Sequence, residues 1–84
     1  MTQSPTPTIL SLAELKTGEH ATLYEIQGGR GIVFRLGPLG FTPGVEIEMT
    51  QNYGRGPLIV TVRGTRVAMG REEARRTMVK KGEA

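Results

Sequence analysis

The sequence has no cysteine, no aspartate and only one histidine, His20, among its 84 residues. Without cysteine there is no disulfide and no thiolate nucleophile, and without aspartate no Ser-His-Asp arrangement can form. The glutamate pairs closest in sequence fall on patterns that predict exposed faces (Glu46 with Glu48, Glu72 with Glu73). Exposed carboxylates lack the burial that tunes a pKa for acid–base work. We therefore expect no catalytic residue and no enzymatic activity.

Ligands for metals and phosphates are also few. A tetrahedral metal site needs several histidine or cysteine ligands, and His20 with a neighbouring glutamate would hold a surface ion only weakly. The glycine-rich stretch Gly28–Gly31 lacks both the GK[ST] ending of a phosphate loop and the spacing of GxGxxG, so it predicts a turn. We expect neither a bound metal nor a cofactor.

Long apolar runs are missing from the chain. No window approaches the roughly 18 apolar residues of a membrane-spanning helix. Residues 1–8 (MTQSPTPT) contain neither the basic start nor the apolar stretch of an export signal. We therefore expect no transmembrane segment and a cytoplasmic location. The Thr, Ser and Pro in residues 1–8 predict a disordered N-terminal tail in front of a single domain, residues 9–81.

Turn-forming residues and short alternating patterns are abundant. Twelve glycines and five prolines indicate many turns, and the alternation of apolar with polar residues predicts strands. The expected elements, in chain order, are a helical turn at 11–15, a strand at 20–26, a short helix at 32–36, strands at 45–51, 58–63 and 66–69, a helix at 71–76 and a last strand at 78–81. About five short strands predict an all-β fold, a small barrel that closes on itself and leaves no exposed edge.

Two local signals fix the ends of elements. Ser11 followed by Glu14 is a capping box, which predicts the helical turn whose Leu12 would cover one end of the barrel. Pro43 fixes its own φ and Gly44 tolerates a positive φ, so this pair predicts a type II turn into the next strand.

The segment Gly29–Gly44, G-R-G-I-V-F-R-L-G-P-L-G-F-T-P-G, resembles the signature of the FeoA family. In that family a glycine turn leads to a short helix that carries R-L-x-x-[LM]-G-[FLI]-x-P-G. The matching residues are Arg35, Leu36, Leu39, Gly40, Phe41, Pro43 and Gly44. Segments before and after it, including L-x-x-L-K-x-G-E and V-A-M-G-R-E-E-A, are similar to the family in the same order. The resemblance implies an SH3-like β-barrel of about five strands with one or two short helices.

The motif is also interpretable physically. We expect Leu36 and Leu39 to bury against the barrel, and Gly40 to end the helix in a left-handed cap, where only glycine avoids a Cβ clash. Gly37-Pro38 departs from the family, which has ordinary helix formers there. Because Pro38 removes a backbone donor, we expect a shorter or kinked helix.

The resemblance implies a function as well. FeoA proteins are small cytosolic proteins associated with the ferrous iron transporter FeoB, a membrane protein with a cytosolic GTP-binding domain. We therefore expect a non-catalytic accessory or regulatory protein of ferrous iron uptake that docks onto the cytosolic part of FeoB at the inner membrane. The candidate contacts are residues whose character the barrel does not need: Tyr24 and Ile59 on outward strand faces, with Tyr53 and Arg55 on a glycine-bounded loop.

Charge is unevenly distributed along the chain, and this distribution is compatible with other functions. Residues 1–51 carry three basic and five acidic side chains, whereas residues 52–84 carry eight basic and three acidic ones. The basic third is either a solubilising surface or the footprint of an acidic partner. One alternative function is a small basic barrel that binds nucleic acid, although Tyr24 and Tyr53 are not interleaved with the arginines, and we expect no stable complex. The other is an interaction module of the kind found in iron-dependent repressors, and weak self-association is a further expectation.

Overall fold

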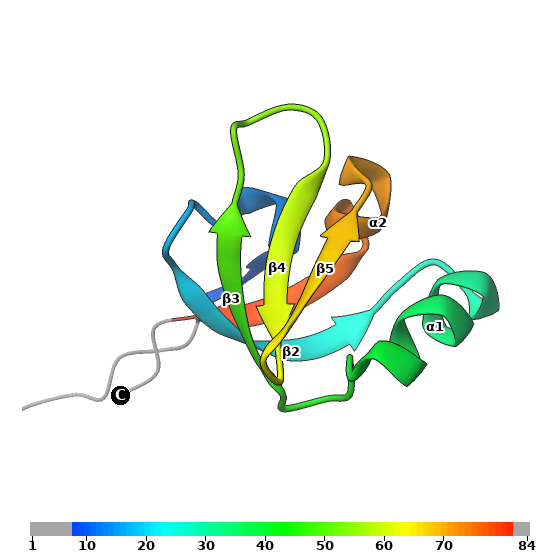
Figure 1. Ribbon diagram of the computed structural model, residues 1–84. Helices are drawn as coiled ribbons and strands as arrows, with labels where there is room; N and C mark the ends of the chain where they lie inside the picture. Colours follow the sequence, from blue (N-terminus) through cyan, green and yellow to red (C-terminus); the bar gives the residue numbers. More distant parts are fainter. Residues whose placement is uncertain (1–7, 82–84) are drawn as a thin grey trace, which may run out of the picture.

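The computed structural model describes residues 8–81. Six short strands alternate with two α-helices and two 3-10 turns (Figure 1). In chain order the elements are β1 (Thr8–Ser11), η1 (Leu12–Glu14), β2 (His20–Ile26), α1 (Arg30–Leu36), η2 (Gly37–Leu39), β3 (Glu46–Gln51), β4 (Leu58–Val62), β5 (Thr65–Met69), α2 (Arg71–Arg75) and β6 (Thr77–Lys81). The mainly β fold class with two short helices predicted from the sequence is confirmed.

All strands belong to one antiparallel sheet with the order β1-β6-β2-β3-β4-β5. The strand β2 turns the corner of this sheet, because residues 20–22 pair with β3 and residues 22–26 pair with β6. Irregular register between Leu23 and Glu25, and again in β3 between Met49 and Gln51, lets the sheet bend around its core. The predicted closure of the barrel is wrong, because β1 pairs with β6 and β5 pairs with β4, leaving the two end strands apart.

The strand β1 was not predicted. It is four residues long and follows a Thr-, Ser- and Pro-rich stretch, so no alternation marks it, and pairing with β6 defines it. The predicted tail, residues 1–8, lies outside the described residues except for Thr8, which begins β1.

The core confirms the predicted alternation. Ile47 and Met49 of β3 are fully buried, as is the inward face of β4. The capping-box turn η1 covers one end, since Leu12 is fully buried and the backbone N–H of Ser11 donates to the Glu14 carboxylate at 3.4 Å. The buried apolar residues form one cluster: Leu12, Leu15, Ala21, Leu23, Leu36, Phe41, Ile47, Met49, Leu58, Val60, Val62, Val67, Met69, Ala74 and Val79.

The hairpin between β4 and β5 turns one residue earlier than predicted. Val62 pairs with Thr65, so the turn residues are Arg63 and Gly64, with φ of 52° and 79°. Positive φ at both central residues is the mark of a type I′ turn, whose twist matches that of the strands it joins. The sequence prediction missed this because it placed Arg63 at the end of the strand.

The segment after α1 follows the predicted turns with one exception. The helix ends at Leu36, the separate turn η2 begins at Gly37 with Pro38 in its first turn, and Gly40 ends it with φ of 103°. The backbone N–H of Val45 donates to the carbonyl of Thr42 at 3.0 Å and Gly44 has φ of 89°, which confirms the type II turn. The predicted burial of Leu39 is wrong: 39% of it is exposed, because the break at Pro38 carries it off the inner face of α1.

Candidate partner-binding surface

The helix α1 projects from the sheet and presents apolar side chains to solvent (Figure 1). Ile32 and Leu36 are four residues apart and share the inner face, where Leu36 is fully buried. Phe34 is 75% exposed and Val33 is 45% exposed. Because single exposed apolar residues are common but an exposed phenylalanine beside other apolar residues is not, this face is a candidate binding surface.

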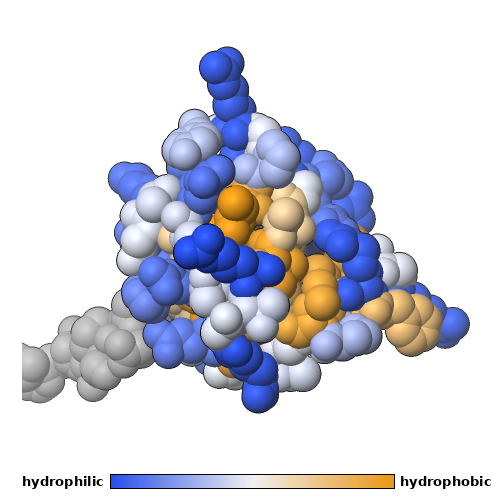
Figure 2. All heavy atoms as spheres, in the orientation of Figure 1, coloured by the Kyte–Doolittle hydropathy of each residue, from blue (hydrophilic) through white to orange (hydrophobic). Residues whose placement is uncertain are grey.

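A shallow depression runs along this helix. One part, of about 250 Å³, is lined by Ile26, Gly29, Arg30, Val33 and Phe34. A second part, of about 210 Å³, shares Ile26 and Val33 and extends to Tyr24 and the Phe41–Pro43 region. We call the surface formed by Tyr24, Ile26, Arg30, Val33 and Phe34 the α1 groove. Figure 2 shows apolar side chains gathered in the middle of the face in view, with more apolar surface over α1 at its right.

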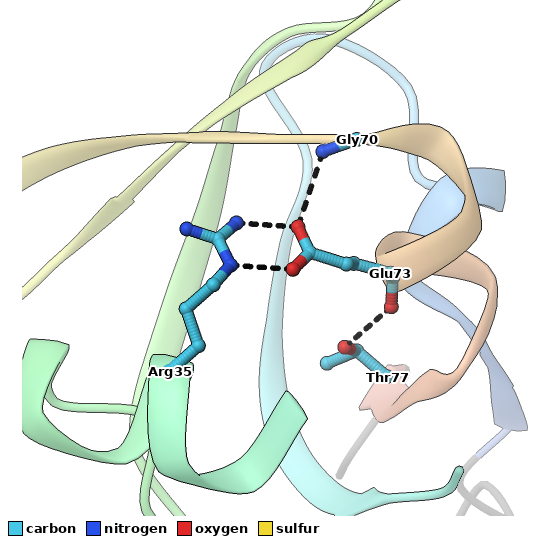
Figure 3. A network of polar contacts seen from close by, with 4 residues as sticks. All are labelled: Arg35, Gly70, Glu73 and Thr77. Carbon is cyan, nitrogen blue, oxygen red and sulfur yellow. Dashed lines mark hydrogen bonds and ion pairs between the residues drawn. The ribbon is translucent and has the colours of Figure 1, made fainter. Parts of the chain in front are cut away.

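An ion pair joins α1 to α2 (Figure 3). The Nε and Nη2 atoms of Arg35 donate to the two carboxylate oxygens of Glu73. The backbone N–H of Gly70 also donates to Glu73 Oε1, at 3.3 Å, and the hydroxyl of Thr77 donates to the Glu73 carbonyl at 2.9 Å. The Arg35 guanidinium lowers the pKa of the Glu73 carboxyl, and the carboxylate raises the pKa of Arg35. Two parallel bonds fix the orientation of the helix as well as its distance.

A second contact holds the turn that leads into α1. The backbone N–H of Gln27 donates to the carbonyl of Arg76 at 2.7 Å. A Cβ atom at Gly28 would lie 2.6 Å from Cδ of Arg76 and 3.3 Å from Cδ1 of Ile32, so the arginine packs directly against the glycine backbone. Glu73 of α2 thus holds α1 at Arg35, and Arg76, the residue that follows α2, holds the preceding turn at Gly28.

Of the four predicted contact residues, only Tyr24 lies in the α1 groove. It is 46% exposed, and the ammonium of Lys80 lies 5.3 Å from the centre of its ring. Tyr53 and Arg55 are exposed on the loop between β3 and β4, and Ile59 is half-buried on the outward face of β4. The structure therefore does not gather the four residues into one site.

Much of the positive charge is already paired within the described residues. Arg35 pairs with Glu73, Arg75 and Arg76 with Glu72, and Lys81 with Glu19. Arg71 instead donates to the carbonyl of Gly56 at 3.2 Å and to the side chain of Asn52 at 2.9 Å. The basic residues of the C-terminal third with no carboxylate partner between residues 8 and 81 are Arg55, Arg63, Arg66, Arg71 and Lys80.

Residues that could ligate a metal are scattered. His20 Nδ1 lies 3.0 Å from a carboxylate oxygen of Glu46, and both side chains are exposed. Within residues 8–81 no group of three or more His, Cys, Asp or Glu residues is placed to hold a metal ion. None of the described helices has the length and apolar character needed to cross a membrane.

The sequence profile of the FeoA domain matches residues 10–81. The chain belongs to the FeoA family. It is 33% identical over 72 residues to a Methanocaldococcus jannaschii protein named "Putative Fe(2+) transport protein A", covering 86% of this chain and 87% of that protein.

Solved FeoA structures share the fold of this FeoA-family chain. A crystal structure of an iron uptake regulatory protein, FeoA, is 33% identical, with a TM-score of 0.82 and coverage of 88% of this chain and 100% of the other. The zinc-complexed FeoA of Stenotrophomonas maltophilia is 32% identical, with a TM-score of 0.75 and coverage of 89% and 99%. That protein is described as a prokaryotic SH3 domain protein, with a suggested role as a ferrous iron transport activating factor. A manganese-dependent repressor, 18% identical with a TM-score of 0.79 over 89% of this chain and 42% of its own, shows a common fold alone.

The matching residues of the family motif that have an evident role in the structure are structural, and the α1 groove lies beside them. Leu36 and Phe41 are buried, Gly40 and Gly44 adopt positive φ, and Arg35 forms the ion pair. The exposed pair Val33 and Phe34 was missed by the sequence prediction. The signal was present, because Ile32 and Leu36 already occupy the inner face at a spacing of four, which leaves the residues between them outside it.

Proposed function

We propose that this FeoA-family protein is a non-catalytic accessory protein of ferrous iron transport that docks onto the cytosolic part of the transporter FeoB. Two relatives carry names that refer to Fe(2+) transport or its activation, which supports the transport context. The observation that carries docking is the exposed apolar face of α1, where Phe34 is 75% exposed. Action at the cytoplasmic side of the membrane follows from the same proposal.

The α1 groove has the composition of a binding hot spot. Aromatic residues on a rigid support contribute most of the energy at protein interfaces, and Phe34 and Tyr24 lie at the two ends of this groove. Arg30 lies at one end and Lys80 stacks beside Tyr24 at the other, and neither pairs with a carboxylate within residues 8–81. An apolar partner segment with an acidic residue at its margin fits this arrangement.

A role without catalysis is supported by how the described carboxylates are used. Glu73 is held in the Arg35 ion pair and Glu19 accepts from Lys16 and Lys81. The single histidine is exposed and pairs with Glu46 outside the α1 groove. Glu25 is the carboxylate that lines the groove; it is exposed and accepts a hydrogen bond from the Gln27 side chain at 3.0 Å, so it lacks the burial that tunes a carboxyl for proton transfer.

The test is binding of the purified protein to the soluble cytosolic part of the transporter, measured with GTP analogue, with GDP and without nucleotide. Wild type should bind in at least one of these states, and Phe34→Ala should weaken binding by about tenfold or more, as expected for an aromatic anchor. Ile9→Ala is the matched control, because Ile9 is an exposed apolar residue on β1 that does not line the groove. Absence of wild-type binding in all three states would overturn the proposed function.

The loop between β3 and β4 is a second proposed contact. Tyr53 is 76% exposed and Arg55 has no carboxylate partner among the described residues, so both are available to a partner. Tyr53→Ala and Arg55→Ala should each weaken transporter binding without changing stability. Binding that is lost steeply with salt, and that is matched by single-stranded nucleic acid, would instead favour the nucleic acid alternative.

A further inference from the structure

The outer strand β5 has backbone groups with no partner. The turn at Arg63 and Gly64 has two residues, so Val62 and Thr65 exchange backbone hydrogen bonds, and bonded pairs recur at every second residue of β5. The N–H and C=O groups of Arg66 and Ala68 therefore point away from β4. Because the sheet does not close, no strand within residues 8–81 lies on that side of β5.

These groups are accessible. Arg66 and Ala68 are both exposed, whereas the alternate residues Val67 and Met69 are buried in the core. Outside the ladder that joins β5 to β4, no group within residues 8–81 donates to or accepts from the main chain of Arg66 or Ala68. The edge thus offers two donors and two acceptors at the spacing of an antiparallel ladder.

We propose that the β5 edge receives an extended segment of the partner protein, which adds a seventh strand to the sheet and carries an acidic residue next to Arg66. Strand addition to an exposed edge draws affinity from main-chain hydrogen bonds and specificity from the side chains that alternate along it. On the outward face of this sheet Arg66 stands opposite Thr61, and Ala68 stands opposite Ile59. The added strand would extend these rows, so the predicted contact Ile59 lies close to the docking segment.

Charge favours an acidic partner over a second copy of this chain. The hairpin and β5 contain Arg63 and Arg66 and no acidic residue, and Arg66 has no carboxylate partner among residues 8–81. Antiparallel pairing of two β5 edges centred on Val67 would bring both Arg66 side chains to neighbouring diagonal positions on one face, where like charges repel. A charged residue in a short edge strand discourages pairing with strands that lack a complementary charge. Arg66 should therefore favour a partner strand that carries an acidic residue.

This inference rests on the proposed function, because the partner is the cytosolic part of the transporter. The decisive variant is Ala68→Pro, which removes the outward N–H and leaves the bonds to β4 intact, and proline is tolerated at such edge positions. Ala68→Val is its matched control, since it keeps the N–H and suits a strand. Arg66→Glu tests the charge, and Arg66→Lys keeps it.

Transporter binding should fall by about tenfold or more for Ala68→Pro and for Arg66→Glu, with near wild-type affinity for the two controls. In the wild-type complex the amides of Arg66 and Ala68 should gain protection from hydrogen exchange. Thermal unfolding of each variant without partner establishes that the fold is retained. If wild type binds the transporter and Ala68→Pro binds it with unchanged affinity, the edge inference alone is overturned. The same conclusion follows if the wild-type protein forms a dimer and Ala68→Pro abolishes that dimer without weakening transporter binding. No binding by wild type would overturn both this inference and the proposed function.

Discussion

The guanidinium of Arg35 in α1 and the carboxylate of Glu73 in α2, 38 residues apart in sequence, meet through two parallel hydrogen bonds. This ion pair gives the arginine of the family motif a role that the sequence did not reveal. The helix α1 has only one fully buried residue, Leu36, so packing alone does little to orient it. Arg35 is therefore a positioning residue for the exposed face that carries Val33 and Phe34.

Breaking this ion pair should loosen α1 more than the sheet. In Arg35→Ala, amides of residues 30–36 should exchange faster with solvent while those of β3 and β4 remain protected, because the sheet keeps its own hydrogen bonds. Arg35→Lys should restore little of the protection of these amides, since an ammonium group cannot donate two parallel hydrogen bonds to the carboxylate. Arg75→Ala is the control, because it removes an exposed pair within α2. Equal exchange rates for α1 in all three variants would contradict the positioning role.

Acid should destabilise the protein in a defined window. Hydrogen bonds from Arg35 lower the folded-state pKa of Glu73. The pKa of Glu19 is lowered mainly by a hydrogen bond from the backbone N–H of Lys16 and also by a hydrogen bond from the side chain of Lys81. The folded state therefore binds fewer protons than the unfolded one, where a glutamate titrates at about 4.3. The stabilisation is fully present above that pH and is lost as pH falls through the lower folded-state values.

The measurement is the urea midpoint as a function of pH. The midpoint should be nearly constant from neutral pH to about pH 5 and should fall below about pH 4. Glu73→Gln and Glu19→Gln should each flatten part of that fall, because each removes one of the titrating groups. A wild-type midpoint that is constant through this acid range would exclude the two ion pairs as contributors to stability.

Substitutions at two residues of α1 should distinguish a role in stability from a role in partner binding. Leu36 is fully buried and Phe34 is 75% exposed. Leu36→Ala should lower the free energy of unfolding by about 2–5 kcal/mol, the cost of lost burial and a cavity. Phe34→Ala should change it by no more than about 0.5 kcal/mol. Chemical denaturation of the two variants measures this, and a large loss in Phe34→Ala would mean that its ring packs in the fold and is not free for a partner.

Asn52 is a structural anchor that the sequence did not mark. Its side-chain amide donates to the carbonyls of Ala13 and Leu15 at 3.1 and 2.6 Å, and its oxygen accepts from Gly54 and Arg71, both at 2.9 Å. Asn52→Ala should lower the free energy of unfolding by about 1–3 kcal/mol, because partly buried groups lose their partners.

The neighbouring Tyr53→Ala is the control for this substitution, since Tyr53 is 76% exposed and should shift the free energy of unfolding by less than about 0.5 kcal/mol. Both values follow from urea denaturation at neutral pH. An Asn52→Ala variant as stable as wild type would contradict the anchoring role.

The sequence predicted those parts of the fold that depend on local chemistry. The alternation at Ile47 and Met49 identified a strand and its inner face, and the positive φ required of Gly40 and Gly44 located two turns. The predicted break at Pro38 is also present, as the boundary between α1 and η2.

Features made by contacts distant in sequence were not predictable in this way. β1 exists through its pairing with β6, and the open edge at β5 depends on which strands pair at the ends of the sheet. The sequence alone did not show which of its several glutamates pairs with Arg35. The candidate surface was anticipated only in part: alternation predicted the outward position of Tyr24, which is exposed, but Phe34 was overlooked because the sequence prediction assigned a face only to Leu36 within the run at 32–36.

The most direct test of docking through the α1 groove is an NMR titration of the isotope-labelled protein with the cytosolic part of the transporter. The account predicts that the largest amide shift changes fall on residues 24–26 and 30–34, and that Phe34→Ala abolishes them at the same partner concentration while Ile9→Ala preserves them. A complex whose shift changes lie elsewhere, for example on β1 and β6 alone, with residues 30–34 unperturbed, would contradict it.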